Sequence, residues 1–155
     1  VVKTVYDPCP AGFKMPASNA FTGFTTTGQS TSFKSQFNVS GDWDMGWNFK
    51  AGGSSTATVY FPGSGYRYDN FGSLDGVGGI GICWSAVPYD TYGGCGLAFN
   101  QGGVLPQSHF NRSYGYSVRP VAEPKTRVTP KTPGSTEEQW GSEQQVGGTE
   151  IDLDN

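Results

Sequence analysis

Histidine, methionine and leucine are scarce in this chain, and no long apolar run is present. The only histidine is His109, so every scheme of histidine-based catalysis or metal binding would have to use one imidazole ring. Long amphipathic helices have little to be built from without leucine and methionine. The longest apolar runs cover only a few residues, such as 79–84, so no membrane-spanning helix is predicted. Lysine and arginine form no cluster and the formal net charge is −3, which argues against a nucleic-acid partner.

Glycine, proline and aromatic residues are abundant instead. The 155 residues include 24 glycines, 10 prolines and 22 Phe, Trp and Tyr rings. A disordered chain of similar glycine content would lack so many rings. The composition therefore predicts one mostly β domain, of the α+β class with few short helices, in which short antiparallel strands and long irregular loops surround an aromatic core.

Six segments carry the residue pattern of strands: 1–6, 56–61, 80–85, 94–99, 104–106 and 114–119. In the last of these, Tyr114, Tyr116 and Val118 alternate with polar residues, which places them on one face. Residues 7–16 contain three prolines and predict a rigid loop. Ser18 is expected to cap a short helix that places Phe21 and Phe24 on one face.

The three cysteines match no zinc or redox motif. A disulfide between Cys83 and Cys95 and buried free thiols both agree with the pattern, so the redox state stays open.

The composition changes after Val121. Residues 122–155 carry three basic and seven acidic residues and a single ring, Trp140, which is typical of an acidic Pro/Thr/Ser/Gly-rich tail. We expect this tail to run extended across its own domain or a partner, as a strand added to a sheet edge. Because the sequence opens directly in a strand-like segment, we also expect it to be the C-terminal piece of a larger protein.

Four motifs occur in a characteristic order: YDPCPAGFKMP at 6–16, FPGSGYR at 61–67, GICWSA at 81–86 and RSYGYSVRPV at 112–121. On these motifs, residues 1–121 resemble the Fibrobacter succinogenes major paralogous domain, found in surface lipoproteins and fimbria-associated proteins of Gram-negative anaerobes. The resemblance implies a C-type-lectin-like or formylglycine-generating-enzyme-like fold in which residues 2–6 pair with 116–121. It implies no agreed set of functional residues. Within the motifs, Trp84 is expected to fill the core and Arg119 to pair with a carboxylate or a carbonyl.

Neither an enzyme nor a metal site is predicted. His109 is expected in a solvated loop, and the arginine- and glycine-rich segment that precedes the paired cysteines of formylglycine-generating enzymes is absent, so a related oxidase activity for Cys83 and Cys95 is the least favoured reading. Calcium is the one cofactor considered, because Asp42, Asp44 and Asn48 are close in sequence, as are Asp69, Asn70 and Asp75. Neither group has the spacing of a calcium loop, and solvated turn residues are the favoured interpretation.

Rings beside acidic residues in expected loops are the candidate ligand-binding residues, since a flat ring can stack on a sugar or anchor a protein contact. They are Trp43, Trp47, Tyr66, Tyr68, Tyr89, Tyr92, Asp42 and Asp44. The alternative is that half of these rings fill the core. The sequence thus predicts a non-catalytic adhesion or ligand-binding module at the cell surface, on the outer face of the outer membrane, with a glycan or protein partner. The second hypothesis is a structural domain of a fimbrial or lipoprotein assembly, joined to other subunits through its C-terminal tail.

Overall fold

A computed structural model describes residues 3–51 and 56–124 of the chain. Strands dominate these residues, and helical structure among them is limited to two 3-10 turns, η1 (Thr22–Phe24) and η2 (Lys34–Gln36). Almost all strand pairs are antiparallel. The predicted mostly β class is therefore confirmed. None of the described helices is long or apolar enough to cross a membrane.

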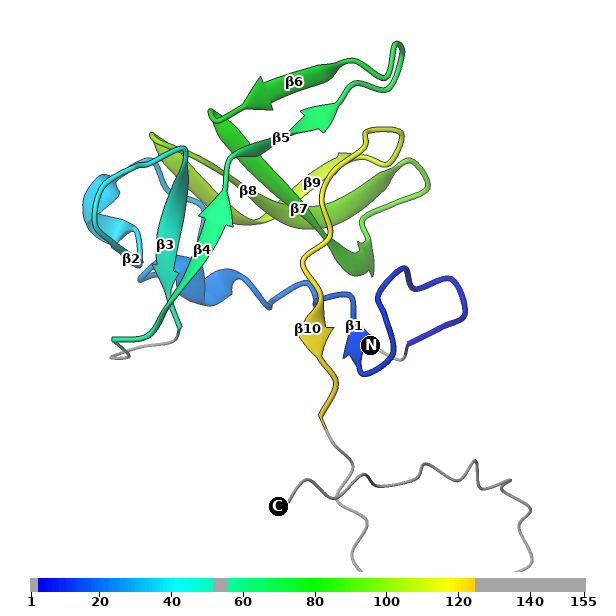
Figure 1. Ribbon diagram of the computed structural model, residues 1–155, viewed down its shortest axis with the longest axis horizontal. Coiled ribbons are helices and arrows are strands. Elements are labelled where there is room, and N and C mark those ends of the chain that lie inside the picture. Colours follow the sequence, from blue (N-terminus) through cyan, green and yellow to red (C-terminus); the bar gives the residue numbers. More distant parts are fainter. Residues whose placement is uncertain (1–2, 52–55, 125–155) are drawn as a thin grey trace, which may run out of the picture. The chain divides into compact units, whose positions relative to one another are not determined.

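The first sheet has the strand order β2-β3-β4 and lies on the left in Figure 1. It consists of β2 (Val39–Ser40), β3 (Gly46–Lys50) and β4 (Thr58–Pro62). Strand β4 confirms the strand predicted at 56–61, shifted by one or two residues at its ends. Strand β3 was missed, because Trp47 was expected to lie in a loop. Its pairing with β4, which sets Trp47 opposite Phe61, overrides the low β-propensity of Gly46 and Asn48.

The second sheet has five strands in the order β6-β5-β7-β8-β9. They are β5 (Ser64–Arg67), β6 (Leu74–Val77), β7 (Ile80–Pro88), β8 (Gly93–Asn100) and β9 (Gly103–Asn111). Strands β7 and β8 confirm the predictions at 80–85 and 94–99, and a turn at residues 101–102 joins β8 to β9. Strand β9 continues far beyond the predicted 104–106. It contains His109, so the loop predicted there was wrong.

A two-stranded ladder joins the two ends of the domain. Strand β1 (Phe13–Lys14) pairs antiparallel with β10 (Val121–Ala122), below the two sheets in Figure 1. The predicted strand at 1–6 was wrong for its described part, residues 3–6. Local polar contacts close a loop there: the Asp7 carboxylate accepts hydrogen bonds from the N–H groups of Cys9 and Met15, and the Lys3 ammonium donates to the carbonyl of Cys9. The predicted pairing of residues 2–6 with 116–121 is accordingly replaced by Phe13–Lys14 with Val121–Ala122.

Residues 114–119 do not form the regular strand that their alternation predicts, and they belong to an irregular segment that covers 112–120. This segment crosses the sheet near β7 in Figure 1 and forms bridges to both β5 and β7. Gly115 exchanges both backbone hydrogen bonds with Arg67 of β5, and Ser117 bonds Ile82 and Trp84 of β7. Since β5 and β7 pair directly only at Gly65 and Gly81, the segment supplies the partners that their remaining backbone groups need. The predicted alternation still holds for Tyr114 and Tyr116, whose rings stack side by side.

The core lies between the two sheets and is aromatic, as predicted. The rings of Phe24 and Phe49 stack 4.0 Å apart, and Phe61 and Phe99 meet Phe49 edge to face. Such arrangements suit the quadrupoles of the rings and add to the burial of their area. Phe21 and Phe24 both enter this core. The predicted Ser18 cap was wrong, because η1 begins after Phe21 and has no side-chain cap.

Candidate ligand-binding face

Trp84 of β7 lies on the outer face of the five-stranded sheet, the face turned away from the core. Successive side chains of a strand point to opposite faces. Cys83 belongs to the core cluster, so Trp84 points away from it. Trp84 remains partly exposed, and the prediction that it fills the core was wrong.

Six rings line this face, and we call them the aromatic strip: Tyr66, Tyr68, Trp84, Phe110, Tyr114 and Tyr116. Tyr116 is central, since its ring lies 4.8 Å from Trp84 and 5.2 Å from Phe110. On its other side it stacks on Tyr114 at 5.6 Å with an interplanar angle of 11°. Tyr114 in turn lies 5.3 Å from Tyr68. The strip is therefore continuous from the β5–β6 hairpin to β9.

Three strands and the inserted segment supply these rings. Tyr66 belongs to β5 and Tyr68 follows it, Trp84 and Phe110 stand on β7 and β9, and Tyr114 and Tyr116 come from the inserted segment. The hydrogen bonds of Gly115 and Ser117 fix that segment, so the backbone holds Tyr114 and Tyr116 over the sheet. The strip is thus a surface that exists only in the folded domain.

Three tyrosines of the strip, Tyr66, Tyr114 and Tyr116, are partly shielded from water, and the pKa of each hydroxyl is raised above the ordinary value of 10.0. Burial raises the pKa of Tyr116 to about 12. Burial, followed by the hydrogen bond to Asp75, raises the pKa of Tyr66. A hydrogen bond with Tyr68 is the first cause that raises the pKa of Tyr114, followed by burial. The face therefore presents neutral rings with hydroxyl groups that both donate and accept hydrogen bonds.

Carboxylates border the strip at the hairpin end. The Tyr66 hydroxyl lies 3.2 Å from Asp75 Oδ2 and donates to it. The Ser113 hydroxyl lies 3.2 Å from Asp69 Oδ2 and 2.9 Å from Asn111 Oδ1. This end consequently combines ring faces with hydrogen-bond acceptors.

A cavity of about 360 Å³ adjoins the strip at its Trp84 end. It arises where β7 bulges away from β8, since Trp84 pairs with Gly96 while Pro88, four residues on, pairs with Gly94. The cavity is lined by Met15, Trp84, Ser85, Ala86, Val87, Pro88, Gly93, Gly94 and Arg112. Trp84 thus belongs both to the strip and to the cavity wall.

Two of the predicted ligand-binding residues, Tyr66 and Tyr68, belong to the strip. Tyr68 is 38% exposed. The prediction placed both in a loop, which is wrong for Tyr66 because it lies in β5. Tyr89 and Tyr92 lie in the β7–β8 connection and are exposed. Tyr89 stacks on His109 at 4.2 Å, and the Tyr92 carbonyl accepts the N–H of Arg112, which brings this connection close to the cavity.

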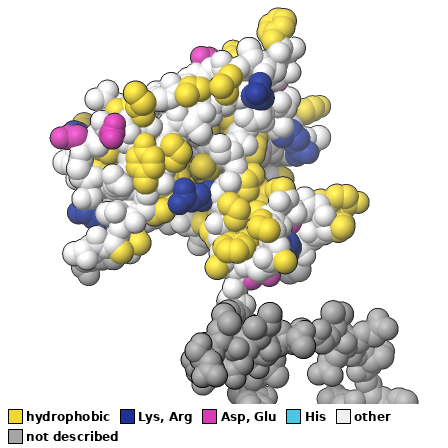
Figure 2. Space-filling view, viewed as in Figure 1, with side chains coloured by type: hydrophobic (Ala, Val, Ile, Leu, Met, Phe, Trp, Pro, Cys, Tyr) yellow, Lys and Arg dark blue, Asp and Glu magenta, His cyan; other side chains and the backbone are white. Residues whose placement is uncertain are grey.

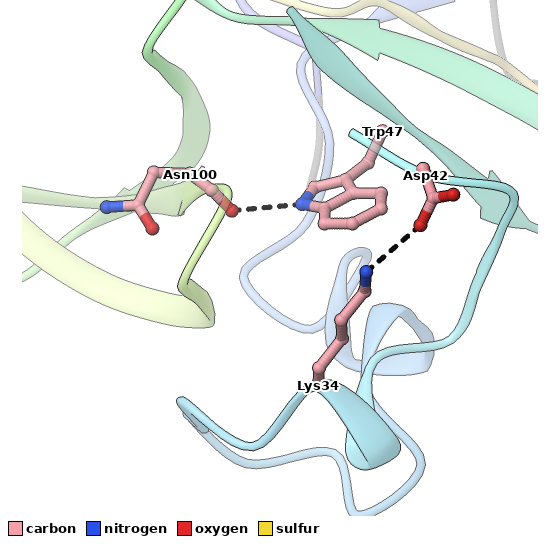
Figure 3. A network of polar contacts seen from close by, with 4 residues as sticks. All are labelled: Lys34, Asp42, Trp47 and Asn100. Atoms are coloured by element: carbon pink, nitrogen blue, oxygen red, sulfur yellow. Dashed lines mark hydrogen bonds and ion pairs between the residues drawn. The ribbon is translucent and has the colours of Figure 1, made fainter. Parts of the chain in front are cut away.

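The four predicted residues near position 43 do not join the strip. Trp47 is fully buried in β3, and its indole N–H donates to the Asn100 carbonyl at 2.9 Å (Figure 3). Its prediction as a surface ligand ring in a loop was wrong. Trp43 is half-buried and packs on Trp47. Asp42 is exposed and pairs with Lys34 at 3.1 Å, and the carbonyl of exposed Asp44 accepts a hydrogen bond from Tyr60.

Tyr114, Tyr116, Phe110 and Arg112 were not among the predicted ligand-binding residues. The period-two spacing of Tyr114 and Tyr116 was the available signal. It indicated that the two rings share a side, and the side itself is set by tertiary pairing with β5 and β7. For Arg119 the expectation is confirmed: its guanidinium donates to the Tyr60 carbonyl at 3.1 Å and lies 4.7 Å above the Phe61 ring.

Within residues 3–51 and 56–124 the three cysteines are unpaired, and the acidic groups form no metal-binding cluster. Cys9, Cys83 and Cys95 are all free, so the Cys83–Cys95 disulfide is absent, and the alternative of buried free thiols holds for Cys9 and Cys83 while Cys95 is partly exposed. Burial raises the pKa of Cys83 to about 11. The part of the chain that the structure describes contains no group of three or more His, Cys, Asp or Glu side chains placed to hold a metal ion. In the two acidic groups considered for calcium, Asp42 pairs with Lys34, and Asp75 accepts hydrogen bonds from Tyr66 and from the Gly76 N–H.

Comparison of the chain with protein-family models, with curated proteins and with solved structures gave no match. The predicted tail contacts fall almost entirely on residues 125–155, which lie outside the described part of the chain.

Proposed function

We propose that this domain is a non-catalytic binding module that recognises a glycan through the aromatic strip. The observation that carries the proposal is the continuity of the strip, in which four tyrosines, Trp84 and Phe110 lie within ring contact of one another on the outer face of a sheet. Partly exposed rings in a contiguous patch are typical of interaction surfaces rather than of ordinary solvent-facing strands.

The chemistry of the strip suits a saccharide. A pyranose ring has an apolar face of C–H groups that packs on flat aromatic rings, while its hydroxyls need hydrogen-bond partners at the ring edges. The tyrosine hydroxyls and the carboxylates of Asp69 and Asp75 provide such partners beside the rings. A row of rings spaced 5 to 6 Å apart would contact consecutive sugars of a chain.

This proposal includes the family and the location expected from the sequence. A C-type-lectin-like domain of the Fibrobacter major paralogous type, displayed on the outer face of a bacterial cell, would present such a face to host or neighbouring-cell glycans. The four motifs named above and the mostly β fold support that assignment. The test of the binding activity itself does not depend on it.

A glycan array probed with the full chain tests the proposal, followed by calorimetry with the oligosaccharides that bind. Tyr68→Ala and Tyr114→Ala should each weaken binding about tenfold or more, because each removes a ring of the strip. Tyr68→Phe should retain most of the affinity if stacking dominates, and lose it if the hydroxyl dominates.

The matched control is Phe71→Ala. Phe71 lies between β5 and β6, is 86% exposed, and has no ring contact within the described residues. It should bind like the wild type. If no saccharide binds the wild-type chain, or if Phe71→Ala and Tyr114→Ala weaken binding equally, the strip is not a glycan-binding face.

A further inference from the structure

The cavity beside Trp84 contains one cationic group, Arg112. Its guanidinium donates through Nη2 to the Asp90 carbonyl at 2.7 Å, which orients the side chain and leaves the other N–H groups available. Among the residues that the structure describes, the one ion pair joins Lys34 and Asp42. Arg112 therefore carries a charge that no described carboxylate neutralises within 4.0 Å.

Asp90, whose backbone carbonyl accepts the bond from Arg112, uses its carboxylate for other hydrogen bonds. Its Oδ1 accepts the N–H groups of Tyr92 at 2.8 Å and Gly93 at 2.6 Å. These bonds shape the β7–β8 turn, whose carbonyls in turn hold Arg112. The turn thus places the Arg112 guanidinium at the cavity without forming an ion pair with it.

The rest of the cavity is suited to the body of a small ring. Met15, Val87 and Pro88 form an apolar part of its wall, and the indole of Trp84 forms a flat part. The indole N–H of Trp84 has no hydrogen-bond partner among the described residues. Every buried side-chain N or O atom of those residues does have a partner, so the Trp84 N–H is not buried and can donate to a ligand. A volume of about 360 Å³ lies at the lower end of the range, ~300–1,000 Å³, of small-ligand sites.

From this arrangement we infer that the cavity is a subsite for a carboxylate-bearing sugar residue. The sugar carboxylate pairs with the Arg112 guanidinium, its apolar face lies on Trp84, and the Trp84 N–H donates to a ring or hydroxyl oxygen. Guanidinium and carboxylate form two parallel charge-assisted hydrogen bonds, which a neutral sugar cannot provide. The inference rests on the proposed function, and it names the class of glycan: an acidic chain whose charged unit enters the cavity while neighbouring sugars cross Tyr116 and Tyr114.

The test compares the affinity of the 155-residue chain for each acidic oligosaccharide with its affinity for the neutral methyl ester of the same oligosaccharide. Oligogalacturonate, a glucuronate-containing disaccharide and a sialyl oligosaccharide, each in both forms, are titrated while tryptophan fluorescence or calorimetry is followed. For at least one pair we expect the acid to bind about tenfold or more tightly than the ester. Raising the salt concentration from about 0.05 to 0.5 M should reduce that preference, because the charge pair is open to solvent.

Arg112→Gln should remove the preference, so that acid and ester bind with the affinity that the wild type shows for the ester. Arg112→Lys, which keeps a point charge, should retain part of it. Lys50→Gln, a charge-matched change on β3 of the other sheet, should leave the preference intact. The salt series needs no variant and so stays informative even if Arg112→Gln disturbs the turn.

Two failures are distinguishable. If acid and ester bind the wild type equally and binding still depends on Tyr114, the carboxylate subsite is wrong and the glycan-binding function stands. If neither form of any oligosaccharide binds, both are overturned.

Discussion

The Trp84 ring lies against the backbone of Gly94 on the neighbouring strand, so that a Cβ atom at residue 94 would sit 2.9 Å from ring carbon Cζ3. This contact holds the indole in the position where it serves both the aromatic strip and the cavity wall. Because the indole also touches Tyr116, a shift of Trp84 is passed on to the stacked tyrosines.

Gly94→Ala should therefore displace Trp84 and lower the free energy of unfolding by about 1–3 kcal/mol, the usual cost of overpacking. Urea unfolding with the tryptophan emission maximum as a second readout measures both effects. Gly23→Ala is the control, since a Cβ there meets nothing within 4 Å. An unchanged unfolding midpoint for Gly94→Ala would show that the ring does not depend on this glycine.

The raised pKa of Tyr116 links stability to alkaline pH. Burial sets its folded pKa at about 12, above an ordinary value of 10.0. The contribution of the neutral hydroxyl is thus complete below pH 10 and declines as the pH rises from about 10 to 12. Compared with wild type, Tyr116→Phe should lose less stability over that window, as seen in denaturant midpoints at successive pH values. Parallel curves for the two proteins would contradict the assignment.

Asp7 gives the opposite dependence. Backbone hydrogen bonds from Met15 and Cys9 favour its charged form and lower its pKa below the ordinary 3.8. Its contribution is complete above about pH 4 and is lost as the pH falls through the folded pKa. Asp7→Asn should weaken the loop that precedes β1 at neutral pH, with faster hydrogen exchange at the N–H groups of Cys9 and Met15.

The matched control for that substitution is Asp42→Asn. Asp42 is highly exposed and its pair with Lys34 is a surface ion pair, so its removal should change stability by less than ~1 kcal/mol. If both variants behave alike at pH 7, the hydrogen bonds of Asp7 do not organise the loop.

The sequence predicted strands best where a strand pairs with its neighbours along the chain. The apolar runs of β7 and β8 predicted those strands well, because both are joined to neighbours by short connections in the same sheet. Residues 114–119 were predicted as a strand from their alternation, but they bond two strands that separate beyond Gly65 and Gly81, which no local pattern reveals. The candidate site was predicted only in part for the same reason. Tyr66 could be nominated from the residues next to it in the sequence, whereas Trp84 and Arg112 are brought to one cavity only by the bulge of β7.

Trp47 shows the opposite error, in which a core ring was predicted to be a surface contact for a ligand. Its neighbours Asp44 and Asn48 are polar, which favoured a loop, yet its ring is fully buried and its N–H bonds the Asn100 carbonyl. Trp47→Phe should cost about 1–3 kcal/mol of unfolding free energy, because it leaves a smaller ring in the core and an unpaired carbonyl. Glycan binding should be unchanged by it. Loss of binding with unchanged stability would return Trp47 to the list of ligand contacts.

The three free thiols should differ in reactivity. The nucleophile is the thiolate, and burial raises the pKa of Cys83 to about 11, against an ordinary value of 9.0. Cys83 should thus have a thiolate fraction roughly a hundred times below that of an ordinary cysteine at pH 8, in addition to being shielded from reagents. Reaction of the native protein with a disulfide reagent should label the partly exposed Cys95 first and leave Cys83 unmodified until urea unfolds the domain. Cys95→Ser should remove the fast phase alone. A fast phase that persists in this variant and disappears in Cys83→Ser would mean that β7 opens in the native state, and the face built on Trp84 would then open with it.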